Sequence, residues 1–145
     1  GEAFDKTARL LNLGYPGGPL IEKCATKGDQ DKYKFPMPLI HEKNSDFSFS
    51  GLKSSVAQTV LNRKITEKFK CDVSASFQKT IVEILLKKTQ QAIKTFNSET
   101  KNTKTANIIV AGGVAANQFI RNSLENLEDQ VKCKFYFPSP LLQSH

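Results

Sequence analysis

Residues 108–117 have the sequence IIVAGGVAAN, in which a short apolar run ends in two glycines ahead of a helical pattern. The run is rich in β-branched side chains and predicts a buried strand. Gly112 and Gly113 allow the backbone to turn sharply and a ligand to approach it closely. A helix that starts there directs its N-terminal N–H groups and the positive end of its dipole at the same place. The stretch therefore predicts either a plain tight turn or a strand, turn and helix that bind an anion such as a phosphate, with Asn117 placed to contact it.

The same stretch predicts an α/β layer in the last third of the chain. A helical pattern of apolar residues follows it, and residues 134–137, Lys-Phe-Tyr-Phe, form a second expected strand. Strands that alternate with helices favour parallel pairing. We therefore expect one partial α/β domain, with a mainly helical portion at residues 1–100 and a strand–helix–strand portion at residues 105–145.

Four helices are expected in the first hundred residues, at 2–13, 19–28, 52–60 and 72–96. The longest has Asp72 as its predicted N-cap. Its core stripe at helical spacing consists of Val73, Phe77, Ile81, Leu85, Ile93 and Phe96. Alternating phenylalanines at 46–50 predict a half-buried strand, and the polar residues 97–107 predict a solvated loop.

The composition is that of an ordinary globular protein, with 39% apolar and 24% charged residues. No segment approaches the roughly 18–20 apolar residues that span a membrane, and no signal peptide is recognisable at the start. The net charge is +7, from 21 Lys and Arg against 14 Asp and Glu. This charge favours polyanions such as RNA, or else forms a solvated lysine-rich surface, because the lysines are spread along the chain.

The three cysteines, Cys24, Cys71 and Cys133, are widely spaced and lie in apolar surroundings. No CxxC pair occurs and neither histidine has metal-ligand spacing, so a zinc site is not expected. We interpret the cysteines as buried, reduced thiols of a cytoplasmic protein. Cys71 precedes the expected helix start at Asp72, a position that can lower a thiol pKa, but no nucleophile is predicted there.

A second glycine-rich loop, GYPGGP at residues 14–19, precedes an expected helix. It could present backbone N–H groups to a ligand or simply join two helices. Glu22 lies one turn after Gly18, where it could accept hydrogen bonds from sugar hydroxyls or be a surface charge favoured by the helix dipole. By spacing alone, Asp5 is a solvated charge on the first helix.

Five motifs occur in one order along the chain. They are GEAFDK at residues 1–6, YPGGP at 15–19, DFSFSGLK at 46–53, ASFQ at 75–78 and AGGVAAN at 111–117. Together they make the chain resemble the TsaD family, also called Gcp or O-sialoglycoprotein endopeptidase, over nearly all of its 145 residues.

The resemblance implies an actin/Hsp70-like ATPase fold, in which two ribonuclease-H-like lobes surround a nucleotide cleft. This chain would form part of one lobe with a helical insertion. The implied reaction transfers a threonylcarbamoyl group from its adenylate to N6 of adenine 37 in tRNAs that read ANN codons. The adenylate would bind at positions matched here by Asp5, Gly18, Glu22, Gly112, Gly113 and Asn117. The acids Asp5 and Glu22 would hold the ribose hydroxyls.

The sequence also departs from the family pattern. The family's divalent metal, iron or zinc, is held by a His-x-x-x-His pair and an Asp in an Asp-Asn-Gly type motif, and neither occurs here. The Ser-Gly-Gly phosphate loop is absent, the chain begins with Gly1, and Met37 is its only methionine. We therefore expect a piece that lacks both ends of a longer enzyme, binds no metal, and is inactive alone because it holds one wall of a two-walled site.

The resemblance further implies several partners. They are tRNA, threonylcarbamoyl-adenylate, a related non-catalytic subunit and, in bacteria, a small ATPase, with no membrane involved. A homodimer is a further expectation, because an open edge of an α/β layer can pair with a second copy. Two alternatives stay open: a non-catalytic paralogue or split-gene product that acts as an interaction module, and a metalloglycoprotease. The protease is disfavoured because no nucleophile–base pair or metal motif is present.

Overall fold

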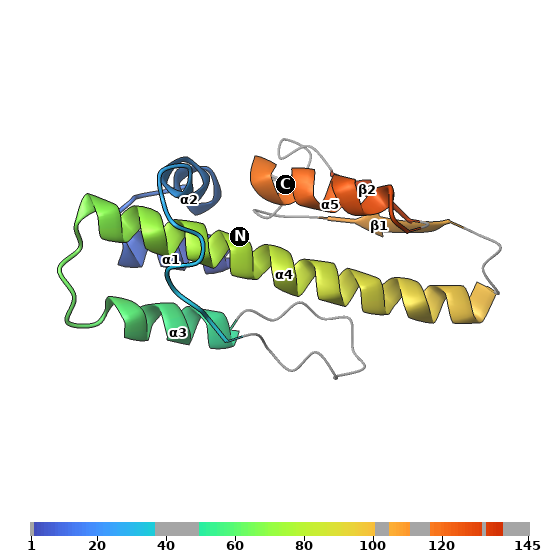
Figure 1. Ribbon diagram of the computed structural model, residues 1–145, viewed down its shortest axis with the longest axis horizontal. Helices are drawn as coiled ribbons and strands as arrows, with labels where there is room; N and C mark the ends of the chain where they lie inside the picture. Colours follow the sequence, from blue (N-terminus) through green and yellow to red (C-terminus); the bar gives the residue numbers. More distant parts are fainter. Residues whose placement is uncertain (1, 37–49, 101–104, 111–116, 132, 138–145) are drawn as a thin grey trace.

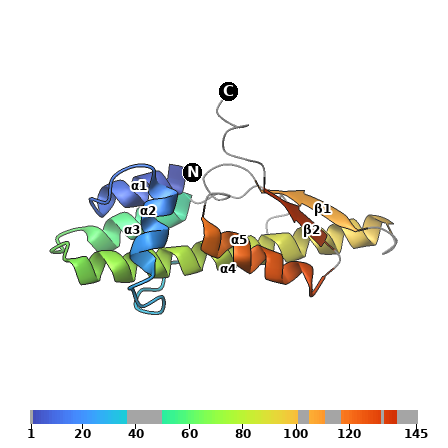
Figure 2. The same cartoon turned by 90° about the horizontal axis from the view of Figure 1, so that it is seen from above.

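The computed structural model describes residues 2–36, 50–100, 105–110, 117–131 and 133–137. In chain order its elements are α1 (Glu2–Leu10), α2 (Gly17–Ala25), α3 (Ser50–Val60), α4 (Glu67–Thr100), β1 (Ala106–Ile109), α5 (Gln118–Glu128) and β2 (Cys133–Tyr136). Helix α4 runs nearly the whole length of the molecule (Figure 1). Helices α1, α2 and α3 gather around its first half, and α5 and the two strands lie along its second half (Figure 2). The described residues therefore form a mixed fold of helices with a small sheet.

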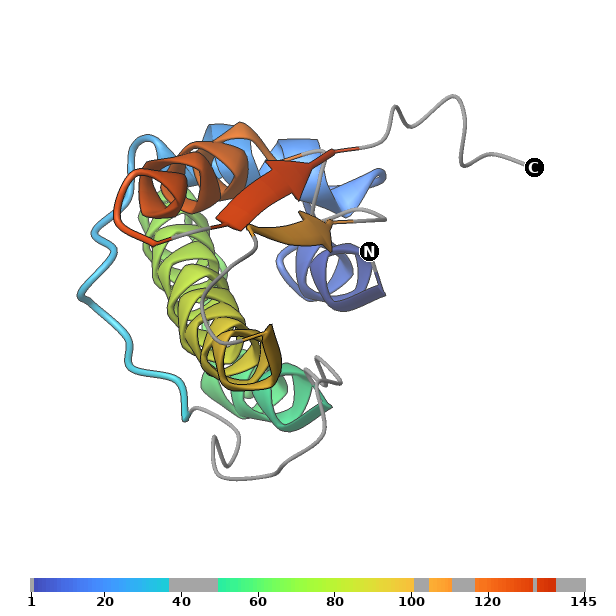
Figure 3. The ribbon, with the colours of Figure 1, turned by 90° about the vertical axis from the view of Figure 1, so that its right-hand side faces the viewer.

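The end of the chain has the predicted strand–helix–strand order with parallel pairing. Strands β1 and β2 are parallel, with Ala106 opposite Cys133 and Ile109 opposite Tyr136. The prediction that the first strand is buried is wrong, because the side chain of Ile109 is 70% exposed. Helices α4 and α5 lie on the same side of the strands (Figure 3). Alternate side chains, such as that of Phe135, face this side, and the intervening ones face outward.

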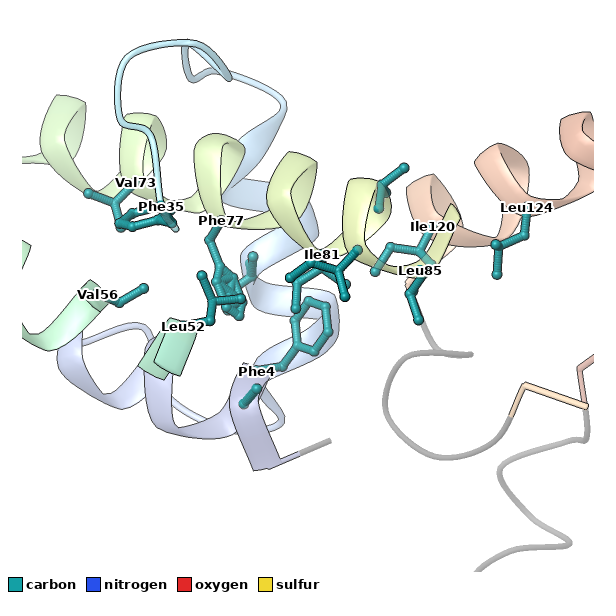
Figure 4. Packing of buried hydrophobic residues seen from close by; sticks show 14 of the residues in the cluster. Phe4, Phe35, Leu52, Val56, Val73, Phe77, Ile81, Leu85, Ile120 and Leu124 are labelled. Carbon is teal, nitrogen blue, oxygen red and sulfur yellow. The ribbon is translucent and has the colours of Figure 1, made fainter. Parts of the chain in front are cut away.

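The predicted apolar stripe of α4 forms the centre of one continuous core (Figure 4). Phe77 is completely buried and meets the ring of Phe4 edge to face, with ring centroids 5.3 Å apart. Leu52 of α3 packs on the same stripe, and further along α4 the stripe meets Ile120 of α5. The apolar residues of α4, which recur every three or four positions, thus form one face that packs against side chains from both halves of the molecule.

Helix α4 is longer than predicted at both ends. It begins at Glu67, where the hydroxyl of Thr66 accepts a hydrogen bond from the N–H of Phe69 at 3.1 Å and caps the helix. It continues to Thr100, through residues that the sequence assigned to a loop. Although α4 has 34 residues, neither it nor any other helix in the described parts of the chain is apolar enough over a sufficient length to cross a membrane.

Several smaller boundaries also differ from the expectation, and α1 ends at Leu10 rather than at Leu13. Helix α2 begins at Gly17, two residues before Pro19, and ends at Ala25 rather than at Gly28. Gly28 instead allows the loop after α2 to pass close to α4, since a Cβ atom there would lie 1.9 Å from the carbonyl oxygen of Cys71. The predicted strand at 46–50 falls almost entirely outside the described residues, and α3 begins at Ser50.

The predicted N-cap Asp72 lies inside α4 and is only 4% exposed. Its Oδ1 accepts a hydrogen bond from the N–H of Asp29 at 2.9 Å, and its Oδ2 pairs with Nζ of Lys68 at 3.1 Å. The hydrogen bond from Asp29, followed by that from Lys68, holds the pKa of Asp72 below its ordinary value. Asp72 therefore fastens the loop after α2 to α4.

We expect Asp72→Asn to reduce the loss of stability on acidification. Because the pKa of Asp72 is lower in the folded than in the unfolded chain, its contribution to stability is present above the unfolded pKa of about 3.9 and is lost as the pH falls through the folded pKa. The free energy of unfolding, measured with urea, should therefore fall less between pH 7 and pH 3 in the variant than in the wild type. Asp129→Asn, at the exposed end of α5, serves as the control and should leave the difference unchanged. Equal differences for the two variants would contradict this role of Asp72.

Candidate functional site

Asp5 on α1 directs its carboxylate at the beginning of α2. Its Oδ1 accepts a hydrogen bond from the N–H of Gly17 at 2.8 Å. Gly17 and Gly18 are buried, and a Cβ atom at Gly17 would lie 2.3 Å from the carbonyl oxygen of Phe4. A glycine is therefore needed for α1 and α2 to approach this closely. Asp5 is not the isolated surface charge that spacing alone suggested, because it bonds the N-terminus of a neighbouring helix.

Glu22 on α2 reaches the beginning of α5. Its Oε1 accepts hydrogen bonds from the N–H groups of Gln118 and Phe119, the latter at 3.0 Å. A carboxylate in this position also meets the positive end of the α5 dipole. This contact joins two segments that each follow a glycine-rich motif and lie nearly a hundred residues apart in the sequence. Local sequence patterns therefore could not predict the contact.

Asn117 is the N-cap of α5 and is completely buried. Its Oδ1 accepts a hydrogen bond from the N–H of Ile120 at 3.0 Å, and its Nδ2 donates one to Oε1 of Gln78 at 2.6 Å. No role for Gln78 was predicted from the sequence, although the residue belongs to the ASFQ motif. The side chain of Asn117 thus joins the start of α5 to the first half of α4.

The N-terminus of α5 differs from the one expected from the sequence. The helix begins at Gln118 rather than directly after the glycines, and its first N–H groups are bonded to Glu22 and Asn117. An anion would have to displace Glu22 to reach them. Gly112 and Gly113 lie outside the described residues, so their contact with a ligand stays a prediction.

The two carboxylates share one arrangement. Each uses one oxygen to accept a hydrogen bond from a helix N-terminus, and each side chain is partly exposed. Within the described part of the chain, Asp5 Oδ2 and Glu22 Oε2 have no hydrogen-bond partner. Gly18 and Glu22 are four residues apart and so lie on the same face of α2. Each carboxylate can therefore offer its second oxygen to a hydroxyl group of a ligand.

A cavity of about 190 Å³ adjoins Glu22 between α2, α4 and α5. Glu22, Gln78 and Phe119 contribute to its wall. Its volume is below the roughly 300–1,000 Å³ of ordinary small-molecule pockets. The cavity could therefore hold one group of a ligand and not a whole nucleotide.

The described residues do not fit the metal that the resemblance implies. Among them, no three His, Cys, Asp or Glu side chains are placed to hold one ion.

The three cysteines are free, as predicted. Cys71 and Cys133 are buried, whereas Cys24 is partly exposed. Cys71 does not lie beside a helix start, because α4 already begins at Glu67. Burial, together with the neighbouring Cys71, raises the pKa of Cys24 to about 11. Burial and the charge of Glu128 likewise raise the pKa of Cys133.

Comparison with known proteins decides the family. A family model described as "TsaD: tRNA N6-adenosine threonylcarbamoyltransferase" matches residues 1–144. The chain belongs to the TsaD family. The resemblance inferred from the five motifs is thereby confirmed.

Individual relatives in the TsaD family cover most of this chain. A protein named tRNA N6-adenosine threonylcarbamoyltransferase from Orientia tsutsugamushi (strain Boryong) is 51% identical over 132 residues, which are 88% of this chain and 38% of the relative. Relatives of the same name from Rickettsia massiliae (strain Mtu5) and Thermosipho africanus (strain TCF52B) are each 48% identical over 95% of this chain and 40% of their own length. The chain therefore spans 38–40% of the length of these TsaD relatives.

Proposed function

We propose that this chain supplies part of the adenylate site of a tRNA N6-adenosine threonylcarbamoyltransferase. The reaction would move a threonylcarbamoyl group from its adenylate to N6 of adenine 37 in tRNAs that read ANN codons. The observation that supports this proposal, in a chain of the TsaD family, is that Glu22 and Asn117 both bond the N-terminus of α5, while Asp5 bonds the N-terminus of α2, the helix that carries Glu22. We also propose that the chain forms part of one lobe of an actin/Hsp70-like ATPase fold.

In this proposal, Asp5 and Glu22 bind the ribose. Asp5 Oδ2 and Glu22 Oε2 would accept hydrogen bonds from its two hydroxyl groups. The other oxygen of each carboxylate is already held by backbone N–H groups, so both carboxylates are oriented before the ligand arrives. Gly18 lies on the same face of α2 as Glu22 and would allow the ligand to approach the backbone.

In this proposal, Asn117 does not contact the ligand itself but positions backbone that does. It fixes the first turn of α5, and with it the end of the connection that contains Gly112 and Gly113. Because Glu22 already bonds the first N–H groups of α5, we place the phosphate at the backbone of these glycines and not at the helix N-terminus. The carboxylate of Glu22 would also repel a phosphate there.

We expect the chain alone to catalyse no transfer. Its TsaD relatives are more than twice as long, and an acyl transfer needs groups on both sides of the adenylate to position the reactants. For the whole enzyme we propose a cytoplasmic location, tRNA as the substrate and an iron or zinc ion as the metal. Its proposed protein partners are the related non-catalytic subunit and the small ATPase. The homodimer also stays a prediction.

A chimeric enzyme tests the proposal. The matching segment of the Orientia tsutsugamushi relative is replaced with this chain, and incorporation of radiolabelled threonine into tRNA is measured with the partner proteins of that relative. The chimera is expected to retain transfer. Glu22→Gln is expected to lower kcat/KM about tenfold, because it removes a charged acceptor and one of the two oxygens.

Glu125→Gln is the matched control for this experiment, because Glu125 is exposed on α5. It should leave transfer within about twofold of the unmodified chimera. Equal rates for the two variants would refute the role of Glu22. A chimera that folds but transfers nothing would refute the proposed function and favour the non-catalytic paralogue.

A further inference from the structure

Cys24 and Cys71 face each other across the contact between α2 and α4. Their Sγ atoms are 3.4 Å apart, and the thiol of Cys24 donates a hydrogen bond to the sulfur of Cys71. Both thiols are free, one partly exposed and one buried. The sulfur–sulfur distance in a disulfide is about 2.05 Å, so the two atoms need to approach by only about 1.4 Å to bond.

The surrounding backbone holds the two thiols together. The loop after α2 passes so close to α4 that Gly28 has no room for a side chain beside the carbonyl group of Cys71. The N–H of Asp29 is bonded to Asp72 at 2.9 Å, and the N–H of Tyr33 is bonded to Oγ of Ser76 at 3.1 Å. These contacts fasten the end of α2 and the following loop to α4, and they keep the thiol pair in place.

We propose that Cys24 and Cys71 are a reversible modification site, which forms a disulfide on oxidation by a low-molecular-weight disulfide and reopens in the presence of a thiol reductant. The partly exposed Cys24 loses its proton to water, and its thiolate attacks one sulfur of the small disulfide. The S–S bond of the reagent breaks, one small thiolate leaves, and a mixed disulfide remains on Cys24.

The second step closes the protein disulfide. Cys71 loses its proton, attacks the sulfur of Cys24 and expels the second small thiolate. Two electrons thus pass from two protein thiols to one small disulfide, which leaves as two thiols after taking up the two protons. The new bond would lie two residues after Glu22, so it would fix α2 on α4 beside the candidate site.

The proposal is tested on the full 145-residue chain with oxidised glutathione as the reagent. The reduced chain is freed of reductant, incubated with excess oxidised glutathione at pH 8.5, unfolded and alkylated with iodoacetamide, and its mass is measured. The alkaline pH is chosen because the raised pKa of Cys24 keeps its thiol protonated at neutral pH. The number of alkylated thiols is expected to fall from three to one, and dithiothreitol should restore all three.

Variants identify the bond. In Cys133→Ser, the number of alkylated thiols should fall from two to none. A digest of the oxidised protein without reductant should contain a peptide that links Cys24 to Cys71. Cys71→Ser should stop with glutathione attached to Cys24. Three alkylated thiols in the treated wild type, a lasting mixed disulfide on its Cys24, or a link that involves Cys133 would each overturn the proposal.

Discussion

Replacing Phe77 with alanine is expected to lower the free energy of unfolding by about 3–5 kcal/mol. The ring is fully buried on α4 and lies edge to face with Phe4, with centroids 5.3 Å apart. The substitution removes this aromatic contact and leaves a cavity at the place where α1, α3 and α4 meet (Figure 4). Since small domains have a total stability of only about 5–15 kcal/mol, a large part of it would be lost.

Urea unfolding followed by far-ultraviolet circular dichroism measures this effect. The control is Tyr15→Ala, which also removes an aromatic ring, but one that is 81% exposed. It should change the free energy of unfolding by no more than about 0.5 kcal/mol. A similar loss in both variants would contradict the central place of Phe77 in the core.

Asn117→Ala is expected to lower the free energy of unfolding by about 2–4 kcal/mol. It removes the N-cap of α5, which is worth roughly 0.5–2 kcal/mol. It also leaves the buried carbonyl oxygen of Gln78 without the hydrogen bond from Nδ2, at a cost of roughly 1–3 kcal/mol. Asn126→Ala, at an exposed position of α5, is the matched control and should have an effect near zero.

A double-mutant cycle separates the two causes. Gln78→Leu removes the other side chain of the pair, so the loss in the double variant should be smaller than the sum of the single losses by about 1 kcal/mol or more. Additive losses would show that the two side chains do not interact. In the chimeric enzyme, Asn117→Ala should also lower transfer, because Glu22 bonds the same turn that Asn117 caps.

The sequence predicted the elements of the fold better than their ends. The period of the α4 stripe is local information, and it identified the helix and its buried face correctly. The N-cap was wrong because Asp72 is a good capping residue by type, whereas its partner is the N–H of Asp29 in a distant loop. The exposure of Ile109 was missed because a run of β-branched residues does not reveal how many faces of a sheet are covered.

The candidate site depended on the resemblance. Spacing alone predicted a solvated charge at Asp5 and left Glu22 as either a sugar-binding acid or a surface charge, and only the matched family motifs joined them to Asn117. The contacts of Glu22 with α5 link segments that are nearly a hundred residues apart, so no local pattern contains them. Gln78 was overlooked because it stands among other polar residues of α4, such as Ser76 and Lys79, and the sequence gives no sign of its distant partner.

Helix α4 packs against both halves of the molecule, so we expect the two halves to unfold together. In the described residues, α4 packs on α2 near its start and on α5 near its end, and Glu22 joins α2 to α5 directly. Melting of the middle turns of α4 would remove the packing surface of both halves at once. The amide hydrogens of these turns should therefore exchange with solvent only through global unfolding, and a ligand bound between α2 and α5 would slow exchange along the whole helix.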